Sequence, residues 1–163
     1  MDRDSLRQLL ERCQKGDVSL DEGVDVLMKD MGEKLGFAHI DRQREARQGF
    51  PEVVYAAGKT AVQVAAILSR LAADSKGSVM ATRVSPEQAE AVRRALPEAV
   101  YDEVSRIAYI RRATAPVDEA RRILVLTAGT SDIPVAAEAA LTAELMGNAV
   151  DTCYDVGVAG IGW

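Results

Sequence analysis

The sequence predicts an α/β protein, and three observations support this fold class. Hydrophobic residues make up 48% of the 163 residues, enough to build the core of one ordinary domain or two small ones. Strand-like and helix-like segments alternate over residues 49–110. The alternation returns over residues 123–156, and a strand-helix-strand order is typical of a parallel sheet covered by helices.

Two helices are expected at the start of the chain. Apolar side chains recur at helical spacing over residues 6–13 and again over residues 20–31. Gly16 separates the two stripes, and Ser19 with Glu22 has the spacing of a capping box. The second helix is therefore expected to begin near residue 20.

A strand, a helix and a second strand are expected next. The first strand begins after Pro51, where valine and tyrosine favour the β conformation. Residues 64–71 carry apolar side chains at helical spacing, and residues 78–83 have the composition of a short strand. These three elements predict one βαβ unit.

A further helix and strand complete this part of the chain. Ser85 can cap a helix, Pro86 suits its first turn, and Gln88 stands three residues after the serine. The helix is expected to stop before Pro97. The apolar residues of the segment 100–110 favour a single strand, although charged residues interrupt them.

A domain boundary is expected within residues 113–122, which contain Pro116 and show no clear apolar period. The N-terminal α/β region then spans residues 1–116, with a helical hairpin in residues 4–34 followed by a βαβαβ succession. The second region spans residues 117–163.

The second region is expected to form one parallel βαβ unit, with a buried strand over 123–126, a helix over 134–146 and a strand over 149–156. A sheet of two parallel strands buries little area and leaves an apolar edge that normally needs further strands and helices. We therefore expect this unit to be incomplete, and to be completed by a partner or by a longer chain.

Composition excludes several classes of protein. The net charge of −5 argues against a nucleic-acid-binding surface. Cys13 and Cys153 are isolated and His39 is the single histidine, so neither a zinc site nor a disulfide framework is expected. The start lacks a signal-peptide pattern, and no run approaches the ~20 apolar residues of a membrane span. A reducing cytoplasm is the expected compartment.

The junction after residue 126 is the best candidate for a binding site. Gly129 lets the backbone approach a ligand, Thr130 and Ser131 offer hydroxyls, and the following helix offers unpaired N–H groups. This combination suits a polar, anionic ligand. Gly157 and Gly160 allow a second close approach after the next strand, or serve only to make a turn.

Asp132 has two interpretations. A carboxylate at a helix N-terminus is stabilised by the helix dipole but repels a phosphate there, so it suits orientation, proton transfer or a bridging cation. Alternatively, Ser131 caps the helix and Asp132 only complements the dipole, an arrangement worth about 1 kcal/mol.

Five short motifs follow one another along the chain: Gly-Phe-Pro-Glu-Val-Val-Tyr at 49–55, Gly-Lys-Thr at 58–60, Ala-Thr-Arg at 81–83, Ala-Gly-Thr-Ser-Asp at 128–132 and Asp-Val-Gly-Val-Ala-Gly at 155–160. From about His39 to Ile161 the chain resembles the LarB family, the pyridinium-3,5-biscarboxylic acid mononucleotide synthases of nickel-pincer cofactor biosynthesis. Their C-terminal half is similar to the PurE-type aminoimidazole ribonucleotide carboxylase and mutase domain. The resemblance therefore implies a Rossmann-like parallel sheet in the second region.

The resemblance also implies an activity. The LarB enzyme carboxylates the pyridinium ring of nicotinic acid adenine dinucleotide with CO2 or bicarbonate and hydrolyses its phosphoanhydride, which releases AMP. No tightly bound cofactor is implied, and Mg²⁺ is the candidate metal. PurE-type domains form closed homo-oligomers, so the complete protein is expected to do the same, and this chain is expected to assemble more weakly.

The resemblance assigns the site residues. Asp132 and Ser131 are the catalytic candidates. The substrate-binding candidates are Gly129, Thr130, Ser131, Gly157, Val158, Ala159, Gly160 and Arg83. Arg83 ends a short expected strand, and its guanidinium matches a phosphate or carboxylate, or else forms an intramolecular ion pair. For Arg42, Glu52 and Lys59, surface roles are favoured over substrate contacts.

Two features depart from the family pattern. The family's catalytic cysteine belongs to a segment beyond residue 163, and Cys153 does not match it, so Cys153 is expected to be a small buried hydrophobe. Gly162 and Trp163 stand where the family has histidine and arginine. The chain is therefore expected to be an incomplete form of the enzyme. The alternatives are a noncatalytic nucleotide-binding or assembly module and a PurE-like aminoimidazole ribonucleotide carboxylase or mutase of purine biosynthesis.

Overall fold

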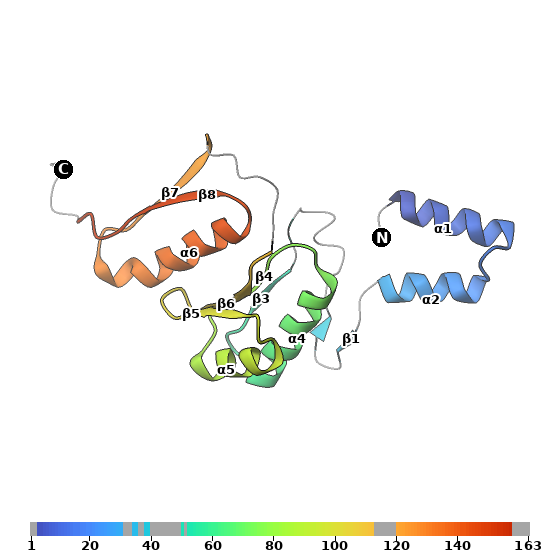
Figure 1. Cartoon of the computed structure of the whole chain (residues 1–163), viewed down its shortest axis with the longest axis horizontal. Coiled ribbons are helices and arrows are strands. Elements are labelled where there is room, and N and C mark those ends of the chain that lie inside the picture. The colour runs from blue at the N-terminus through green and yellow to red at the C-terminus, as the bar shows by residue number, and fades with distance from the viewer. Residues whose placement is uncertain are drawn as a thin grey trace. The chain divides into compact units, whose positions relative to one another are not determined.

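The computed structural model describes residues 3–30, 34–35, 38–39, 50, 52–112 and 120–157. The chain divides into two compact units, residues 1–52 and residues 53–163, and Figure 1 shows the order of their elements. The boundary expected near residue 116 falls in residues 113–119, outside the described residues, and stays a prediction. The α/β fold class is confirmed.

The first unit opens with the expected helical hairpin of α1 (Arg3–Lys15) and α2 (Leu20–Asp30). Gly16 has a left-handed φ of +80°, which turns the chain after α1. The capping box is confirmed, because Glu22 N donates to Ser19 Oγ at 3.1 Å and Ser19 N donates to Glu22 Oε2 at 2.9 Å. A short antiparallel pair that the sequence did not predict, β1 (Lys34–Leu35) with β2 (Ala38–His39), follows.

The second unit begins with a four-stranded sheet in the order β3-β4-β6-β5. Its strands are β3 (Val53–Tyr55), β4 (Val79–Thr82), β5 (Val100–Asp102) and β6 (Ile107–Ile110). The helices are α4 (Ala61–Asp74) and α5 (Pro86–Ala95). β3 and β4 are parallel and joined by α4, so the predicted βαβ unit is confirmed. Ser85 caps α5 as expected, and α5 ends before Pro97.

The prediction of a single strand over 100–110 is wrong, because this segment forms the antiparallel hairpin of β5 and β6. The charged residues that interrupt the apolar pattern form the turn. Asp102 Oδ1 accepts hydrogen bonds from Ser105 N at 2.7 Å and Ser105 Oγ at 2.6 Å. Arg106 then takes a left-handed φ of +55° before β6 begins.

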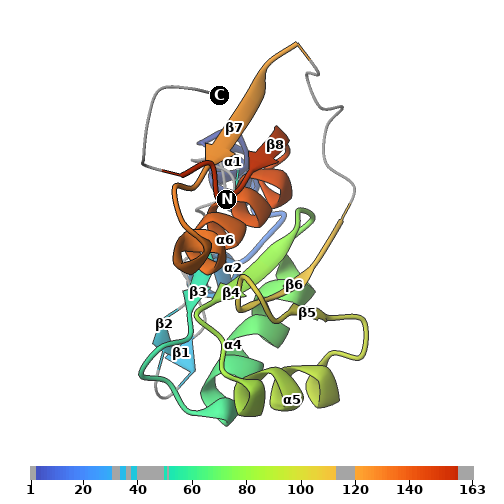
Figure 2. The ribbon, with the colours of Figure 1, turned by 90° about the vertical axis from the view of Figure 1, so that its left-hand side faces the viewer.

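The core of the second unit lies around this sheet. The β4 residues Val79, Met80 and Ala81 are each 0% exposed, so the strand is covered on both faces. α4 packs against β3, β4 and α5. Figure 2 shows α4 and α5 on one side of the sheet and α6 on the other, as in Figure 1.

The last elements form the predicted parallel βαβ unit. They are β7 (Arg122–Leu126), a 3-10 turn (Thr130–Asp132), α6 (Ile133–Leu145) and β8 (Ala149–Cys153). β7 and β8 pair in parallel, with Ile123 opposite Val150. β8 is shorter than the predicted strand, which extended to residue 156.

The expectation that β7 is buried is wrong. Ile123, Leu124 and Leu126 are 41%, 59% and 57% exposed. Cys153 is also exposed, so its predicted burial is wrong too. The reason is that, within the described residues, the sheet consists of β7 and β8 alone and α6 packs on it from one side. Leu124 and Leu126 lie on one face of β7 and Ile123 lies on the other. Both faces of the strand therefore remain partly exposed, in agreement with the open apolar surface expected of a two-stranded parallel sheet.

Among the residues that the structure describes, no helix has the length and apolar character needed to cross a lipid bilayer.

Candidate active site

The carboxyl ends of β7 and β8 are joined by backbone hydrogen bonds beyond the strands. Thr127 N donates to Cys153 O at 3.1 Å, and Val156 N donates back to Thr127 O at 3.0 Å. Gly157 N then donates to Ala128 O at 2.9 Å. The predicted turn 128–132 and the start of the predicted loop 155–160 therefore lie side by side at one edge of the sheet.

The turn presents polar side chains to solvent. Thr130, Ser131 and Asp132 are all exposed. Gly129 has an extended backbone with φ −130° and ψ 162°, and a Cβ atom there would only come within 3.9 Å of Asp132 Oδ2 and Ser131 Oγ. The fold therefore does not require glycine at this position, which leaves ligand approach as a reason for it.

Asp132 is held by the turn that it closes. Its Oδ2 accepts a hydrogen bond from Gly129 N at 3.3 Å, and its own N–H donates to Gly129 O at 3.1 Å. Within the described residues Oδ1 makes no hydrogen bond, so one carboxylate oxygen remains for a ligand. Asp132 directly precedes α6 without a side-chain capping bond, and no capping bond of Ser131 is found in this part of the structure. The interpretation of Ser131 as the helix cap therefore does not hold.

Two residues that were not among the predicted site residues connect the turn to the loop. Thr127 directly follows β7 and is 6% exposed, and its Oγ1 accepts a hydrogen bond from Asp155 N at 3.0 Å. Asp155, two residues after β8, has a left-handed φ of +59°, which non-glycine residues adopt rarely. A polar residue shortly after each strand was the signal that could have identified them. Gly157 has a φ of +79°, and residues 158–160 lie outside the described residues.

Arg83 lies in the other part of the unit and contacts α6. It follows β4 with a left-handed φ of +57°, and its Nε lies 2.8 Å from Glu138 Oε2. The intramolecular ion pair, one of the two interpretations of Arg83, is thus present. Lys59 Nζ donates to Tyr55 O at 2.7 Å, and Arg42 lies outside the described residues.

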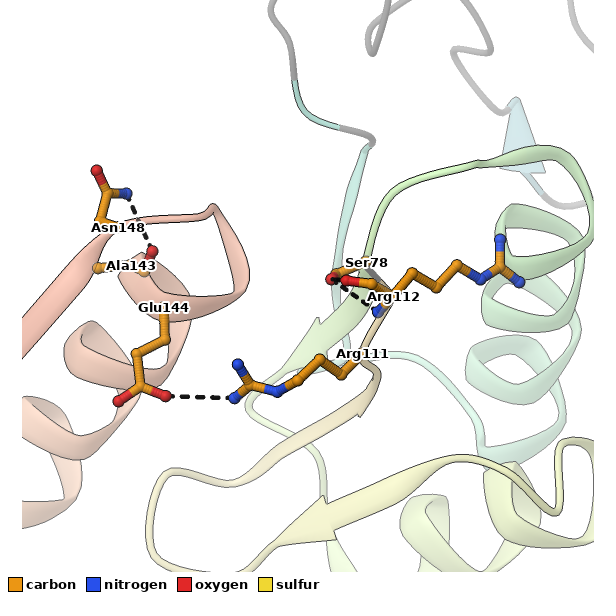
Figure 3. Close-up of polar contacts among 6 residues, drawn as sticks. All are labelled: Ser78, Arg111, Arg112, Ala143, Glu144 and Asn148. Carbon is orange, nitrogen blue, oxygen red and sulfur yellow. Dashed lines mark hydrogen bonds and ion pairs between the residues drawn. The ribbon is translucent and has the colours of Figure 1, made fainter. Parts of the chain in front are cut away.

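A second ion pair connects α6 to the four-stranded sheet at its other end. Arg111 Nη2 lies 3.2 Å from Glu144 Oε2, and Figure 3 shows the two side chains meeting. Arg112 extends the opposite way in Figure 3. Its Nη2 donates to Ala72 O at 2.5 Å and closes the end of α4. Adjacent arginines after β6 therefore contact two different helices.

These two ion pairs fix the direction of α6. Glu138, at the middle of α6, meets Arg83 after the end of β4, whereas Glu144, in the last turn of α6, meets Arg111, which follows the partner of the first β4 residue. α6 therefore runs antiparallel to β4, as it does to β7 and β8. The carboxyl ends of both parallel strand pairs consequently lie toward the N-terminal end of α6, where ligands of open α/β sheets bind.

The described residues hold no group of three or more histidine, cysteine, aspartate and glutamate side chains that could bind a metal ion. A magnesium ion at Asp132 would therefore take most of its ligands from water and from the phosphates of a substrate, as Mg²⁺ commonly does in proteins. A groove of about 280 Å³ lies along α1, lined by that helix alone, and contains none of the predicted site residues.

Residues 32–112 match the family model described as the LarB/PurE-like N-terminal domain. The chain is also 35% identical, over 167 aligned positions, to an uncharacterized protein of Methanocaldococcus jannaschii. The alignment covers 96% of this chain and 63% of that protein, so the chain spans less than two thirds of its relative. Residues 32–112 are therefore similar to the LarB/PurE-like N-terminal domain, and this match supports a relationship of the chain to the LarB family.

Proposed function

We propose that this chain acts in the carboxylation of the pyridinium ring of nicotinic acid adenine dinucleotide with CO2 or bicarbonate, and in the hydrolysis of the dinucleotide's phosphoanhydride. The reaction belongs to nickel-pincer cofactor biosynthesis in the cytoplasm. The LarB/PurE-like match supports the family. The single observation that carries the site is the hydrogen-bonded meeting of the 128–132 turn with the 155–157 loop.

The chemistry of the turn suits the reacting end of this substrate. The ring carries a carboxylate, which exposed hydroxyls and the N-terminus of α6 can bind. Thr130 and Ser131 supply those hydroxyls, and Gly129 lets the ring approach the backbone. Replacing a ring hydrogen by a carboxylate releases a proton, and we assign its acceptance to the exposed Oδ1 of Asp132. Gly157 and the following residues 158–160 would line the other side of the ring.

The activity is tested by incubating the purified chain with nicotinic acid adenine dinucleotide and bicarbonate. We expect AMP to appear together with a pyridine mononucleotide that has gained one carboxyl group, and Asp132→Asn to lower the rate at least about a hundredfold, as loss of a general base does. Binding without AMP release would support the noncatalytic module instead. Turnover of aminoimidazole ribonucleotide alone would support the purine enzyme.

We further propose that the complete protein forms a closed homo-oligomer and that this chain assembles more weakly. The open apolar surface of β7 and β8 supports this, because such surfaces are normally covered. Light scattering that finds a stable, closed oligomer of this chain would contradict the second half of the proposal.

A further inference from the structure

Two guanidinium nitrogens of Arg83 are available to a ligand. Its Nε lies 2.8 Å from Glu138 Oε2 in an ion pair, whereas no contact of Nη1 or Nη2 is found within the described residues. The side chain is 43% exposed, so these nitrogens can meet a ligand from solvent. A guanidinium with both Nη groups available matches the oxygens of a phosphate in a bidentate arrangement.

The position of Glu138 places this cation relative to the turn. Glu138 stands six residues after Asp132 on α6, which corresponds to about 9 Å along the helix axis. Asp132 repels phosphate at the turn itself, so a ligand bound there by its ring must carry its phosphates elsewhere. Arg83 is a cation that meets α6 at its middle, through Glu138, and on the side of Glu144 that faces the turn along the helix axis.

We propose that Arg83 binds the diphosphate of the dinucleotide and that Glu138 is a positioning residue, which holds the arginine through Nε so that Nη1 and Nη2 face the ligand. This inference rests on the proposed function for the identity of the ligand. In this arrangement the bound substrate contacts both sheets of the second unit. Its ring lies after β7 and its diphosphate lies after β4.

The chain offers a matched control for this pair. Arg111 and Glu144 also join the four-stranded sheet to α6, at an N–O distance of 3.2 Å, although Glu144 is 43% exposed and Glu138 is 23% exposed. Glu144 stands twelve residues after Asp132, or about 18 Å along the axis. Loss of this pair removes a comparable contact between sheet and helix without touching the proposed diphosphate site.

The test measures the dissociation constants of the full chain for two probes, nicotinic acid adenine dinucleotide and inorganic pyrophosphate. Arg83→Asn is the first variant, because asparagine tolerates the left-handed backbone of this position. This substitution should raise the dissociation constants for both probes by about tenfold or more, which corresponds to the loss of a charge-assisted hydrogen bond. Arg83→Lys, which keeps the charge but not the fork, should recover only part of the affinity.

Glu138 is tested by rescue. Glu138→Ala should weaken the binding of pyrophosphate severalfold. Glu138→Gln keeps an oxygen acceptor for Nε, so this variant should bind pyrophosphate about as well as the original chain. Glu144→Ala and Arg111→Ala should leave both affinities unchanged. Equal losses from Glu138→Ala and Glu144→Ala would overturn the positioning role. Unchanged binding in Arg83→Asn, with its folding verified by circular dichroism, would overturn the diphosphate site.

The two proposals fail in different ways. If the chain converts the dinucleotide but Arg83→Asn binds it normally, the proposed function stands and the diphosphate site is wrong. If pyrophosphate binds in an Arg83-dependent manner but the dinucleotide neither binds nor reacts, the anion site stands and the proposed function is wrong. If neither probe binds, both are wrong.

Discussion

The two sheets of the second unit show that the sequence of a strand does not decide its burial. β4, with the sequence Val-Met-Ala-Thr, is buried at its first three residues, whereas β7, with the more apolar sequence Ile-Leu-Val-Leu after its arginine, is largely exposed. β4 has a strand on each side and packs against α4, while β7 has, within the described residues, one neighbouring strand and one helix. Burial therefore depends on layers that the local sequence does not specify.

The largest effect should come from truncating one leucine in each region. Leu68→Ala removes a fully buried side chain from α4 and should lower the free energy of unfolding by about 2–5 kcal/mol. Leu124→Ala removes a side chain that already lies mostly in solvent, and should change the free energy of unfolding by less than about 0.5 kcal/mol. Urea unfolding measures both. Similar losses would mean that β7 is covered in solution.

Two glutamines at equivalent positions separate capping from core hydrogen bonding. Gln63 and Gln88 both close capping boxes with their Oε1 atoms. Gln88 is also buried, and its Nε2 donates to Ala56 O at 3.0 Å and Lys59 O at 2.7 Å. Gln88→Ala should therefore cost about 1–3 kcal/mol, because it leaves carbonyls unsatisfied.

The matched variant Gln63→Ala removes only the capping contact and should cost about 1 kcal/mol or less. The difference between the two unfolding free energies reports the hydrogen bonds that hold the Lys59 turn onto α5. Equal costs would show that the turn is solvated without Gln88.

Gly129→Ala should change stability by less than about 1 kcal/mol, because the backbone there is extended and a methyl group has room. The same substitution should weaken binding of nicotinic acid adenine dinucleotide, since it places a methyl group where the ring approaches the backbone. Thermal unfolding and titration calorimetry measure the two effects. A large loss of stability, or unchanged affinity, would contradict the role given to this glycine.

The smallest effect concerns acid sensitivity on the open face. Arg122, which donates to both carboxylate oxygens at 2.5 and 2.8 Å, holds the pKa of Asp151 below its ordinary value. A lowered pKa in the folded state stabilises the protein above the unfolded pKa, and this contribution is lost as the pH falls through the folded value. The thermal midpoint of the original chain should therefore exceed that of Asp151→Asn near neutral pH, and the difference should shrink below about pH 4. A constant difference would contradict this account.

Local signals predicted most elements, and the errors have a common cause. Ser85 with Gln88 and Ser19 with Glu22 marked their helix starts correctly, because capping involves residues only three apart. The hairpin of β5 and β6 was missed because its turn depends on Asp102 accepting from Ser105 and on the left-handed Arg106. The exposure of Leu124 and Cys153 could not be predicted from their neighbours in sequence.

The candidate site shows the same limit. The 128–132 turn could be located because a glycine and hydroxyl residues follow an apolar run. The proposed part of Arg83 in this site could not be predicted, since within the described residues Arg83 reaches α6 through Glu138, a residue that no motif marks. Pairs between distant segments depend on the packing of the helix and not on spacing along the chain.

The most direct test of the site is hydrogen exchange of the backbone amides with and without nicotinic acid adenine dinucleotide. Slower exchange in residues 129–133 and 155–157 when the dinucleotide is present is the result that we predict. Unchanged exchange at both segments, or protection confined to other parts of the chain, would contradict the placement of the substrate at the carboxyl edge of β7 and β8.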